Sequence, residues 1–361
     1  MKNKVIVLVN TGTPDKPEKK YVRKFLSEFL NDPRVIDMPW IARKLLVNLV
    51  IVPFRTARST RLYRRLWTVD GSPLLCNLEK LAAKLRAAAG HEYSVTAAMR
   101  YGNPSLKGAL KKLQNQQVDE LVIFPLFPQY ASSTTGSVHE YVMKEISRWN
   151  NIPEVSLTGQ FYSHHSFISA FAAQVRKYDP GKYDHVLFSY HSLPLKHIQA
   201  AHPDQDLSGC KCKDNLPEYG NSCYKAACYE TTRLLAEALE LPEGKYSTSF
   251  QSRFAKNWLG PFTDQTLKEL AVSGKKRILF FAPSFVADCL ETIVEVDEYR
   301  NSFVNRGGEE LVLVESLNDN DEWVQAVIEI SQNTSPQPPL EGHSRQANFY
   351  NSLIFNRDDY F

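Results

Sequence analysis

The stretch Phe281-Ala-Pro-Ser-Phe-Val-Ala-Asp-Cys-Leu-Glu-Thr-Ile-Val-Glu-Val-Asp-Glu-Tyr299 joins a strand pattern to a helix pattern. An apolar run ends at Pro283 of this stretch. Helical spacing begins at Asp288, a residue type that can cap a helix. Glu291, Glu295 and Glu298 fall at i, i+4 and i+7, so three carboxylates share one helix face. Open α/β sheets bind ligands at such strand-to-helix junctions. The acidic face is therefore either a solvated surface or the wall of a site along which a cation passes.

The same alternation of strand and helix patterns continues on both sides of this stretch. Strand-like runs lie at 5–9, 93–98, 121–127, 155–160, 185–190, 246–250, 277–282 and 310–314. Helical patterns with short links separate them, which favours parallel sheets covered by helices on both faces. The number of strands suits two doubly wound domains better than one sheet. We place the boundary near 150–165.

The composition limits the function classes. The chain has 361 residues, of which 43% are hydrophobic and 23% charged, and its net charge is only +3. This balance does not indicate a nucleic-acid partner. The apolar core near the N-terminus is short and meets a turn, so a first strand is expected there rather than a signal peptide. No stretch reaches the ~18 apolar residues of a membrane span, and a cytoplasmic chain is expected.

His191 directly follows a buried strand pattern, within Ser189-Tyr-His-Ser-Leu-Pro194. We expect this imidazole at the same sheet edge as Glu291, where its near-neutral pKa suits proton transfer or metal binding. An ordinary histidine with a hydrogen-bond partner is the alternative. The chain has no Gly-x-Ser-x-Gly nucleophile elbow and no Gly-rich phosphate loop. Nucleotide-dependent chemistry is therefore disfavoured.

The segment 39–54 is rich in apolar residues and leads into a row of arginines at 55, 58, 61, 64 and 65. An apolar helix beside a basic row is typical of a membrane-surface or hydrophobic-ligand lip. From the residues alone, a core helix followed by a solvated helix fits slightly better.

Four of the six cysteines lie close together in the chain: Cys210, Cys212, Cys223 and Cys228. A long chain without a secretion signal is a poor candidate for disulfides, so this group indicates a metal or a cluster. Four thiolates can hold an iron–sulfur cluster or a closed zinc site, and the spacing does not decide between the two.

Seven short motifs follow one another along the chain. They are Val9-Asn-Thr-Gly-Thr-Pro14, Val69-Asp-Gly-Ser-Pro-Leu74, Met99-Arg-Tyr-Gly-Asn-Pro104, Phe124-Pro-Leu-Phe-Pro-Gln-Tyr130, Ser189-Tyr-His-Ser-Leu-Pro194, Phe250-Gln-Ser-Arg253 with Trp258-Leu-Gly-Pro261, and Asp288-Cys-Leu-Glu-Thr292. In this order they resemble the motifs of the ferrochelatases, which insert ferrous iron into a porphyrin at the end of haem synthesis. The resemblance covers about residues 4–330.

The resemblance implies roles for individual side chains. His191 would take pyrrole protons or contact the metal, and Glu291 would face it across the porphyrin. Glu295, together with Asp288, would belong to an acidic path for protons or the cation. Trp258 would pack near the macrocycle, and further residues would surround the porphyrin or its propionates: Tyr130, Arg100, Tyr101, Ser132 and Ser137. The four cysteines would hold a [2Fe–2S] cluster, with zinc as the alternative.

The resemblance also implies an architecture and a reaction. The expected fold has two Rossmann-like α/β domains, 1–160 and 161–332, with the active-site cleft between them and a tail at 333–361. The first domain would carry an apolar lip at 39–66 that faces the porphyrin and rests peripherally on a membrane, and the second the cysteine segment 208–230. The reaction would insert Fe²⁺ into protoporphyrin IX, giving protohaem and two protons. The alternatives are a coproporphyrin III ferrochelatase, another tetrapyrrole metal chelatase, and a non-enzymatic haem or iron–sulfur sensor.

Overall fold

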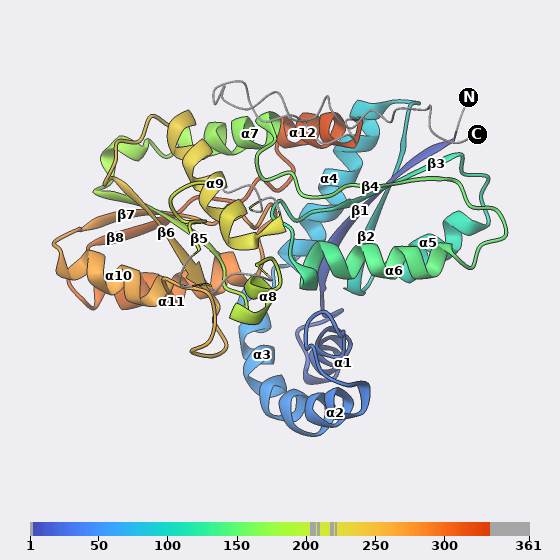
Figure 1. The fold of residues 1–361 in the computed structure, drawn as a ribbon, viewed down its shortest axis with the longest axis horizontal. Coiled ribbons are helices and arrows are strands. Elements are labelled where there is room, and N and C mark those ends of the chain that lie inside the picture. Colours follow the sequence, from blue (N-terminus) through green and yellow to red (C-terminus); the bar gives the residue numbers. More distant parts are fainter. Residues whose placement is uncertain (1–2, 203–206, 208–209, 217–219, 221, 333–361) are drawn as a thin grey trace, which may run out of the picture.

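The fold contains two four-stranded sheets of parallel strands, which lie side by side (Figure 1). The computed structural model describes residues 3–202, 207, 210–216, 220 and 222–332. The first sheet has the order β2-β1-β3-β4 and the second the order β6-β5-β7-β8. The strands of the first sheet are β1 (Lys4–Thr13), β2 (Ser94–Gly102), β3 (Glu120–Pro125) and β4 (Glu154–Leu157). Those of the second are β5 (His185–His191), β6 (Tyr246–Gln251), β7 (Arg277–Phe281) and β8 (Glu310–Leu313).

Helices connect consecutive strands and cover the faces of both sheets. Those around the first sheet are α1 (Lys19–Leu30), α2 (Trp40–Leu45), the π-helix η1 (Leu46–Ile51), α3 (Val52–Leu66), α4 (Pro73–Ala89), α5 (Leu106–Gln114), the π-helix η2 (Ser132–Gly136) and α6 (Ser137–Ile146). Those around the second are α7 (His165–Arg176), the 3₁₀ turn η3 (Pro180–Lys182), α8 (Leu195–Gln199), α9 (Tyr224–Ala238), α10 (Thr263–Val272), α11 (Leu290–Val304) and α12 (Asp321–Gln332).

The alternation of side chains along β1 shows how the first sheet is sandwiched. Val5, Val7 and Val9 pack with residues of α5 and α6, while Ile6 and Leu8 pack with residues of α4. Both sets are fully buried, as expected for a central parallel strand covered on both faces. The continuous apolar run near the N-terminus is therefore explained by burial on two sides.

Gly12 is required where β1 and β2 end together. Its φ is +127°, and a Cβ at this position would lie 1.8 Å from the carbonyl oxygen of Tyr101 on the neighbouring strand. Only glycine tolerates both the backbone conformation and this approach. The glycine of the first sequence motif thus allows two strand ends to meet at the carboxyl edge of the sheet.

An aromatic core joins the two sheets. Trp323 of α12 is fully buried and contacts the rings of Phe124, Phe161 and Phe167. The chain of ring contacts continues through Phe171 to the second sheet, whose residue Phe281 lies 5.0 Å away between ring centroids. Helix α12 accordingly lies between α4 and α7, next to both halves of the molecule (Figure 1).

The segment α1, α2, η1 and α3 projects from the first sheet as an arm (Figure 1). Its inner side chains, among them Phe25 and Val47, form a small core together with Tyr101 of β2. Its outer side chains are apolar and exposed: Trp40 by 65%, Leu49 by 67% and Phe54 by 81%. The segment is thus an exposed apolar surface rather than a core helix, contrary to the interpretation that the residues alone slightly favoured.

The predicted fold class, α/β with two helix-flanked parallel sheets, is confirmed. The exact division into 1–160 and 161–332 stays a prediction, and the tail 333–361 lies outside the described residues. Within the described ranges, no helix is long and apolar enough to cross a bilayer.

Candidate active site and metal centre

His191 is the last residue of β5 and pairs in register with Gln251 at the end of β6. Its Nδ1 lies 2.5 Å from the carbonyl oxygen of Ser192, and the hydroxyl of Tyr224 donates to the His191 carbonyl oxygen at 2.8 Å. A carbonyl oxygen can only accept, so the proton of the neutral imidazole is on Nδ1. Nε2 then carries the lone pair, which makes it the atom able to act as a base.

Gln251 connects the His191 strand to the acidic helix. Its side-chain nitrogen donates to the main-chain oxygen of Glu291 at 2.8 Å, and Glu291 belongs to the first turn of α11. The rings of Trp258 and Phe285 each lie 6.4 Å from the imidazole of His191, measured between ring centroids. The structure therefore brings His191, Trp258 and the start of α11 to one place, the carboxyl edge of the second sheet.

Glu295 lies one helical turn beyond Glu291 and its carboxylate has three donors. The main-chain N–H of Ser252 donates to Oε1 at 3.0 Å, the Ser252 hydroxyl donates to Oε2 at 2.5 Å, and the Tyr299 hydroxyl donates to Oε1 at 2.6 Å. Burial nevertheless raises the pKa of Glu295 above its usual value, and the charge of Glu291 acts in the same direction. Glu295 is thus a fixed carboxylate that holds a proton more readily than a free glutamate.

Asp288 has a different environment from the two glutamates. Its Oδ2 accepts from the side-chain amide of Asn318 at 2.7 Å, and its Oδ1 accepts from the Thr292 hydroxyl at 3.2 Å. The residue that caps α11 is Cys289, not Asp288, because the helix begins at Leu290. Asp288 instead ties the start of α11 to the loop that precedes α12.

The arm contributes to the same region through α3. Tyr63 is partly buried, and its pKa is raised by desolvation and then by the nearby charge of Glu291. The guanidinium of Arg65 lies 3.4 Å from a carboxylate oxygen of Glu298, which is half exposed. These contacts bring helix α3 of the first half against α11 of the second. The acidic helix is therefore covered by the arm.

Arg100, Tyr101 and Ser137 converge on Asp32, a buried residue that the sequence did not single out. Asp32 Oδ2 accepts from the Arg100 guanidinium at 2.7 Å, from the Tyr101 hydroxyl at 2.8 Å and from the Ser137 hydroxyl at 2.7 Å. The three residues form one network because β2, α6 and the loop after α1 meet there. The network borders a hollow of about 530 Å³ lined by Lys24, Ser27, Glu28, Asn31, Asp32, Pro33, Lys44, Arg100 and Tyr101. All of these residues come from the first half of the chain.

Tyr130 and Ser132 lie in the hydroxyl-rich segment between β3 and α6. The guanidinium of Arg34 donates to the Ser132 hydroxyl at 3.1 Å. A Cβ on Gly136 would lie 2.8 Å from the Tyr130 hydroxyl and 3.2 Å from Arg34, so these groups pack closely around the turn. Arg34 also pairs with Glu140. The segment thus gathers hydroxyls around one arginine.

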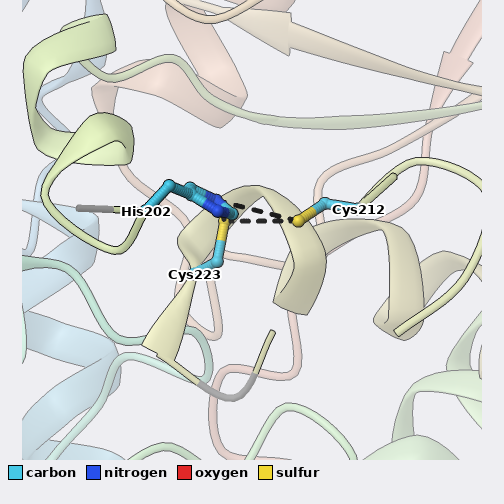
Figure 2. Close-up of side chains that lie close together, drawn as sticks. All are labelled: His202, Cys212 and Cys223. Carbon is cyan, nitrogen blue, oxygen red and sulfur yellow. Dashed lines mark hydrogen bonds between the residues drawn. The ribbon is translucent and has the colours of Figure 1, made fainter. Parts of the chain in front are cut away.

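The predicted cysteine group is only partly brought together. His202 Nε2 lies 3.2 Å from the sulfur of Cys223 and 3.8 Å from that of Cys212 (Figure 2). The sulfur of Cys210 lies 3.9 Å from the same nitrogen. The sulfurs of Cys212 and Cys223 lie 3.8 Å apart. The hydrogen bond from Cys212 lowers the pKa of Cys223, which favours its thiolate, the form that binds metals. A buried His-Cys-Cys group of metal-binding type therefore exists here, with Cys210 beside it.

Cys228 does not belong to this group. It lies on α9, five positions beyond Cys223, and is fully buried. His202 was missed by sequence reasoning because it precedes the first cysteine by eight positions with no recognisable metal-binding spacing. Ser252 and Tyr299 were also missed as partners of Glu295; the position of Tyr299 at i+4 was the only available signal.

Comparison with known proteins agrees with this geometry. The family model described as ferrochelatase matches residues 3–335. The ferrochelatase of Coxiella burnetii (strain CbuK_Q154) is 39% identical over 340 residues, which cover 91% of this chain and 94% of the relative. The ferrochelatase of Legionella pneumophila (strain Corby) is 40% identical over 332 residues, covering 90% and 97%.

Solved structures with the same fold include SirB from Bacillus subtilis with Fe³⁺, at a TM-score of 0.54 and 10% identity over 92% of this chain and 95% of that one. The sirohydrochlorin chelatase SirB from Bacillus subtilis subspecies spizizenii in complex with cobalt has a TM-score of 0.51, 10% identity and the same coverage. The fold is that of the two-domain α/β chelatases. The chain belongs to the ferrochelatase family, and thus to the metal chelatases.

Proposed function

We propose that this enzyme inserts Fe²⁺ into protoporphyrin IX, giving protohaem and releasing two protons in haem biosynthesis. The observation that carries the proposal is the convergence of His191, Glu291 and Glu295 at one sheet edge, under an arm that bears an exposed apolar surface. A porphyrin is a large apolar ring whose centre must lose two protons as the metal enters. A base and fixed carboxylates beside an apolar surface are the groups that this reaction needs.

In the proposed mechanism, Nε2 of His191 accepts a pyrrole proton. The Ser192 carbonyl holds the proton on Nδ1, so Nε2 presents its lone pair to the substrate. Glu291 is the carboxylate that faces the metal, and its charge offsets that of the arriving cation. Glu295 lies one turn further along α11 and, because its pKa is raised by burial, can receive protons and pass them on. Asp288, behind Glu291, is proposed to belong to the same acidic path.

We place the macrocycle against the ring of Trp258, which lies beside the His191 imidazole. The carboxylates of the porphyrin are assigned to the segment that contains Tyr130 and Ser132 and to the network of Arg100, Tyr101 and Ser137. The guanidinium groups of Arg34 and Arg100 supply positive charge in this region. Because Arg100 is already paired with Asp32, its side chain is expected to orient its neighbours as much as to bind a carboxylate itself.

We further propose that the arm rests peripherally on a membrane, from which an apolar porphyrin can enter, while the protein acts in the cytoplasm. Trp40, Leu49 and Phe54 are exposed on its outer side. Lys44 and Arg58 lie on the same helical segment and can face anionic headgroups. No nucleic-acid partner is proposed.

The cysteine group is proposed to hold a [2Fe–2S] cluster, with zinc as the second candidate. The side chains of Cys212, Cys223 and His202 fit a metal because their donor atoms are buried and mutually close. Cys228 was predicted as the fourth ligand and stays a prediction. Such a cluster supplies one-electron redox capacity when bound. The steps of iron insertion proposed above do not pass through it.

The substrate is tested by anaerobic assays of Fe²⁺ insertion with protoporphyrin IX and with coproporphyrin III. The proposal predicts a higher kcat/KM for protoporphyrin IX. A higher value for coproporphyrin III would assign the enzyme to that substrate instead. Binding of porphyrin without insertion of any divalent metal would favour a sensor.

A further inference from the structure

His202 lies among the sulfurs of the cysteine segment at distances that a metal ligand would have. Its Nε2 is 3.2 Å from the sulfur of Cys223, 3.8 Å from that of Cys212 and 3.9 Å from that of Cys210. Only 3% of His202 is exposed. Figure 2 shows its ring directed at the sulfurs of Cys212 and Cys223. The imidazole thus occupies a position that sequence reasoning had given to a fourth thiolate.

The distances among the donor atoms of His202, Cys212 and Cys223 are close to the edges of a tetrahedron around one metal ion. Metal–sulfur bonds of about 2.3 Å and metal–nitrogen bonds of about 2.0 Å give tetrahedral edges of about 3.8 Å between sulfurs and about 3.5 Å between nitrogen and sulfur. The sulfurs of Cys212 and Cys223 are 3.8 Å apart, as expected for two sulfurs on one ion. The distances from His202 Nε2 to the three sulfurs are 3.2, 3.8 and 3.9 Å, and they lie on both sides of the expected nitrogen–sulfur edge. Three cysteines and one histidine form a common metal-binding set.

Cys228 is a weaker candidate for the fourth donor. The His-Cys-Cys group whose donor atoms lie within 4.8 Å of one another includes neither Cys228 nor Cys210, but the Cys210 sulfur lies 3.9 Å from His202 Nε2 and 3.7 Å from the ammonium nitrogen of Lys225. The Cys228 thiol is fully buried on α9, where its hydrogen-bond partner is the side chain of Tyr224.

We propose that His202 is a direct ligand of this centre through Nε2, and that the donor set is Cys210, Cys212, Cys223 and His202. For a mononuclear site the set suits zinc. For a [2Fe–2S] cluster, one imidazole in place of a thiolate raises the reduction potential relative to an all-cysteine cluster. The inference rests on the proposal that the centre holds a metal, and it does not depend on iron insertion at His191.

The test is X-ray absorption at the edge of the metal that co-purifies with the full-length protein, iron or zinc, under anaerobic conditions. The wild type is expected to show a first-shell nitrogen at about 2.0 Å together with outer-shell imidazole scattering. His202→Cys should show sulfur only, and Cys228→Ser should keep both the metal and the nitrogen signal. Iron insertion is assayed in parallel, since its loss bears on His191 and not on this centre.

A sulfur-only first shell in the wild type would overturn the assignment of His202, whatever the variants do. Protein with neither iron nor zinc after anaerobic purification would overturn it as well. Retention of the nitrogen signal in His202→Cys would assign the imidazole to another histidine. Loss of that signal in His202→Cys with the metal retained would establish His202 as the ligand.

Discussion

Ser252 holds both carboxylate oxygens of Glu295, one through its main-chain N–H and the other through its hydroxyl. Ser252 has a φ of +62°, a strained conformation for a residue other than glycine. The strained residue directly follows β6 and fixes the carboxylate that the proposed proton path requires. The two residues together therefore position a partly buried acid beside His191.

Ser252→Ala removes one of the donors that favour the ionised form of Glu295, so the pKa of Glu295 should rise further. We expect kcat for iron insertion to fall about tenfold, the equivalent of one lost hydrogen bond to a charged group, with little change in KM for the porphyrin. The acid limb of the kcat profile should move to higher pH. Ser273→Ala removes an exposed hydroxyl and is the control. An unchanged pH profile in Ser252→Ala would show that the contact does not act on catalysis.

His185 predicts an acid-sensitive stability. Burial lowers the pKa of His185 from 6.5 to about 4, so the folded state takes up its proton later than the unfolded state as the pH falls. Stability is therefore lost between about pH 6.5 and pH 4, by up to about 3 kcal/mol. His185→Gln should flatten this part of the curve of unfolding free energy against pH, and the exposed His91→Gln should not. Parallel curves for wild type and His185→Gln would contradict the prediction.

Asp32→Ala removes the carboxylate that neutralises the largely buried Arg100 guanidinium. The Arg100 and Asp32 side chains are 15% and 4% exposed, so we expect a loss of about 3 kcal/mol in unfolding free energy. Adding Arg100→Met should recover part of the loss, because the unpaired charge is then removed. Glu309→Ala breaks an exposed pair with Lys276 and should cost less than about 1 kcal/mol. Strictly additive losses in the double variant would mean that the two residues do not stabilise each other.

The arm predicts reversible binding to lipid. Replacing Trp40 and Phe54 together with serine should weaken association with anionic phosphatidylglycerol vesicles at least tenfold, because each side chain contributes about 1.5–3 kcal/mol on transfer from water. Val272→Ser changes a similarly exposed apolar residue on α10, away from the arm, and should have no effect. Equal binding of the double variant and the wild type would refute a membrane role for the arm.

The parallel sheets could be predicted from the sequence because strand runs such as 5–9 are short, apolar and separated by helical patterns. The meeting of His191 with α11 was also accessible, since the carboxyl ends of parallel strands share one edge. In both cases a local pattern combined with a general rule of sheet topology was sufficient.

Contacts between distant segments were not accessible in this way. Asp32 lies in an unremarkable loop, and only folding brings it to Arg100, 68 positions away. His202 likewise lacks a recognisable spacing to Cys223. The cap of α11 was misplaced because Asp288 is the usual residue type for a cap, whereas its side chain is engaged by Asn318. Local preference was overridden there by a tertiary contact.

The most direct test of the account is an anaerobic assay of Fe²⁺ insertion into protoporphyrin IX by His191→Ala and Glu291→Gln, with porphyrin binding measured separately by fluorescence quenching. Glu298→Gln, which alters the exposed partner of Arg65, is the matched control. The account predicts that each of the first two variants loses at least about a hundredfold in kcat. Porphyrin affinity should stay nearly unchanged, and the control should be as active as the wild type. Iron insertion at the wild-type rate by His191→Ala or Glu291→Gln would contradict it.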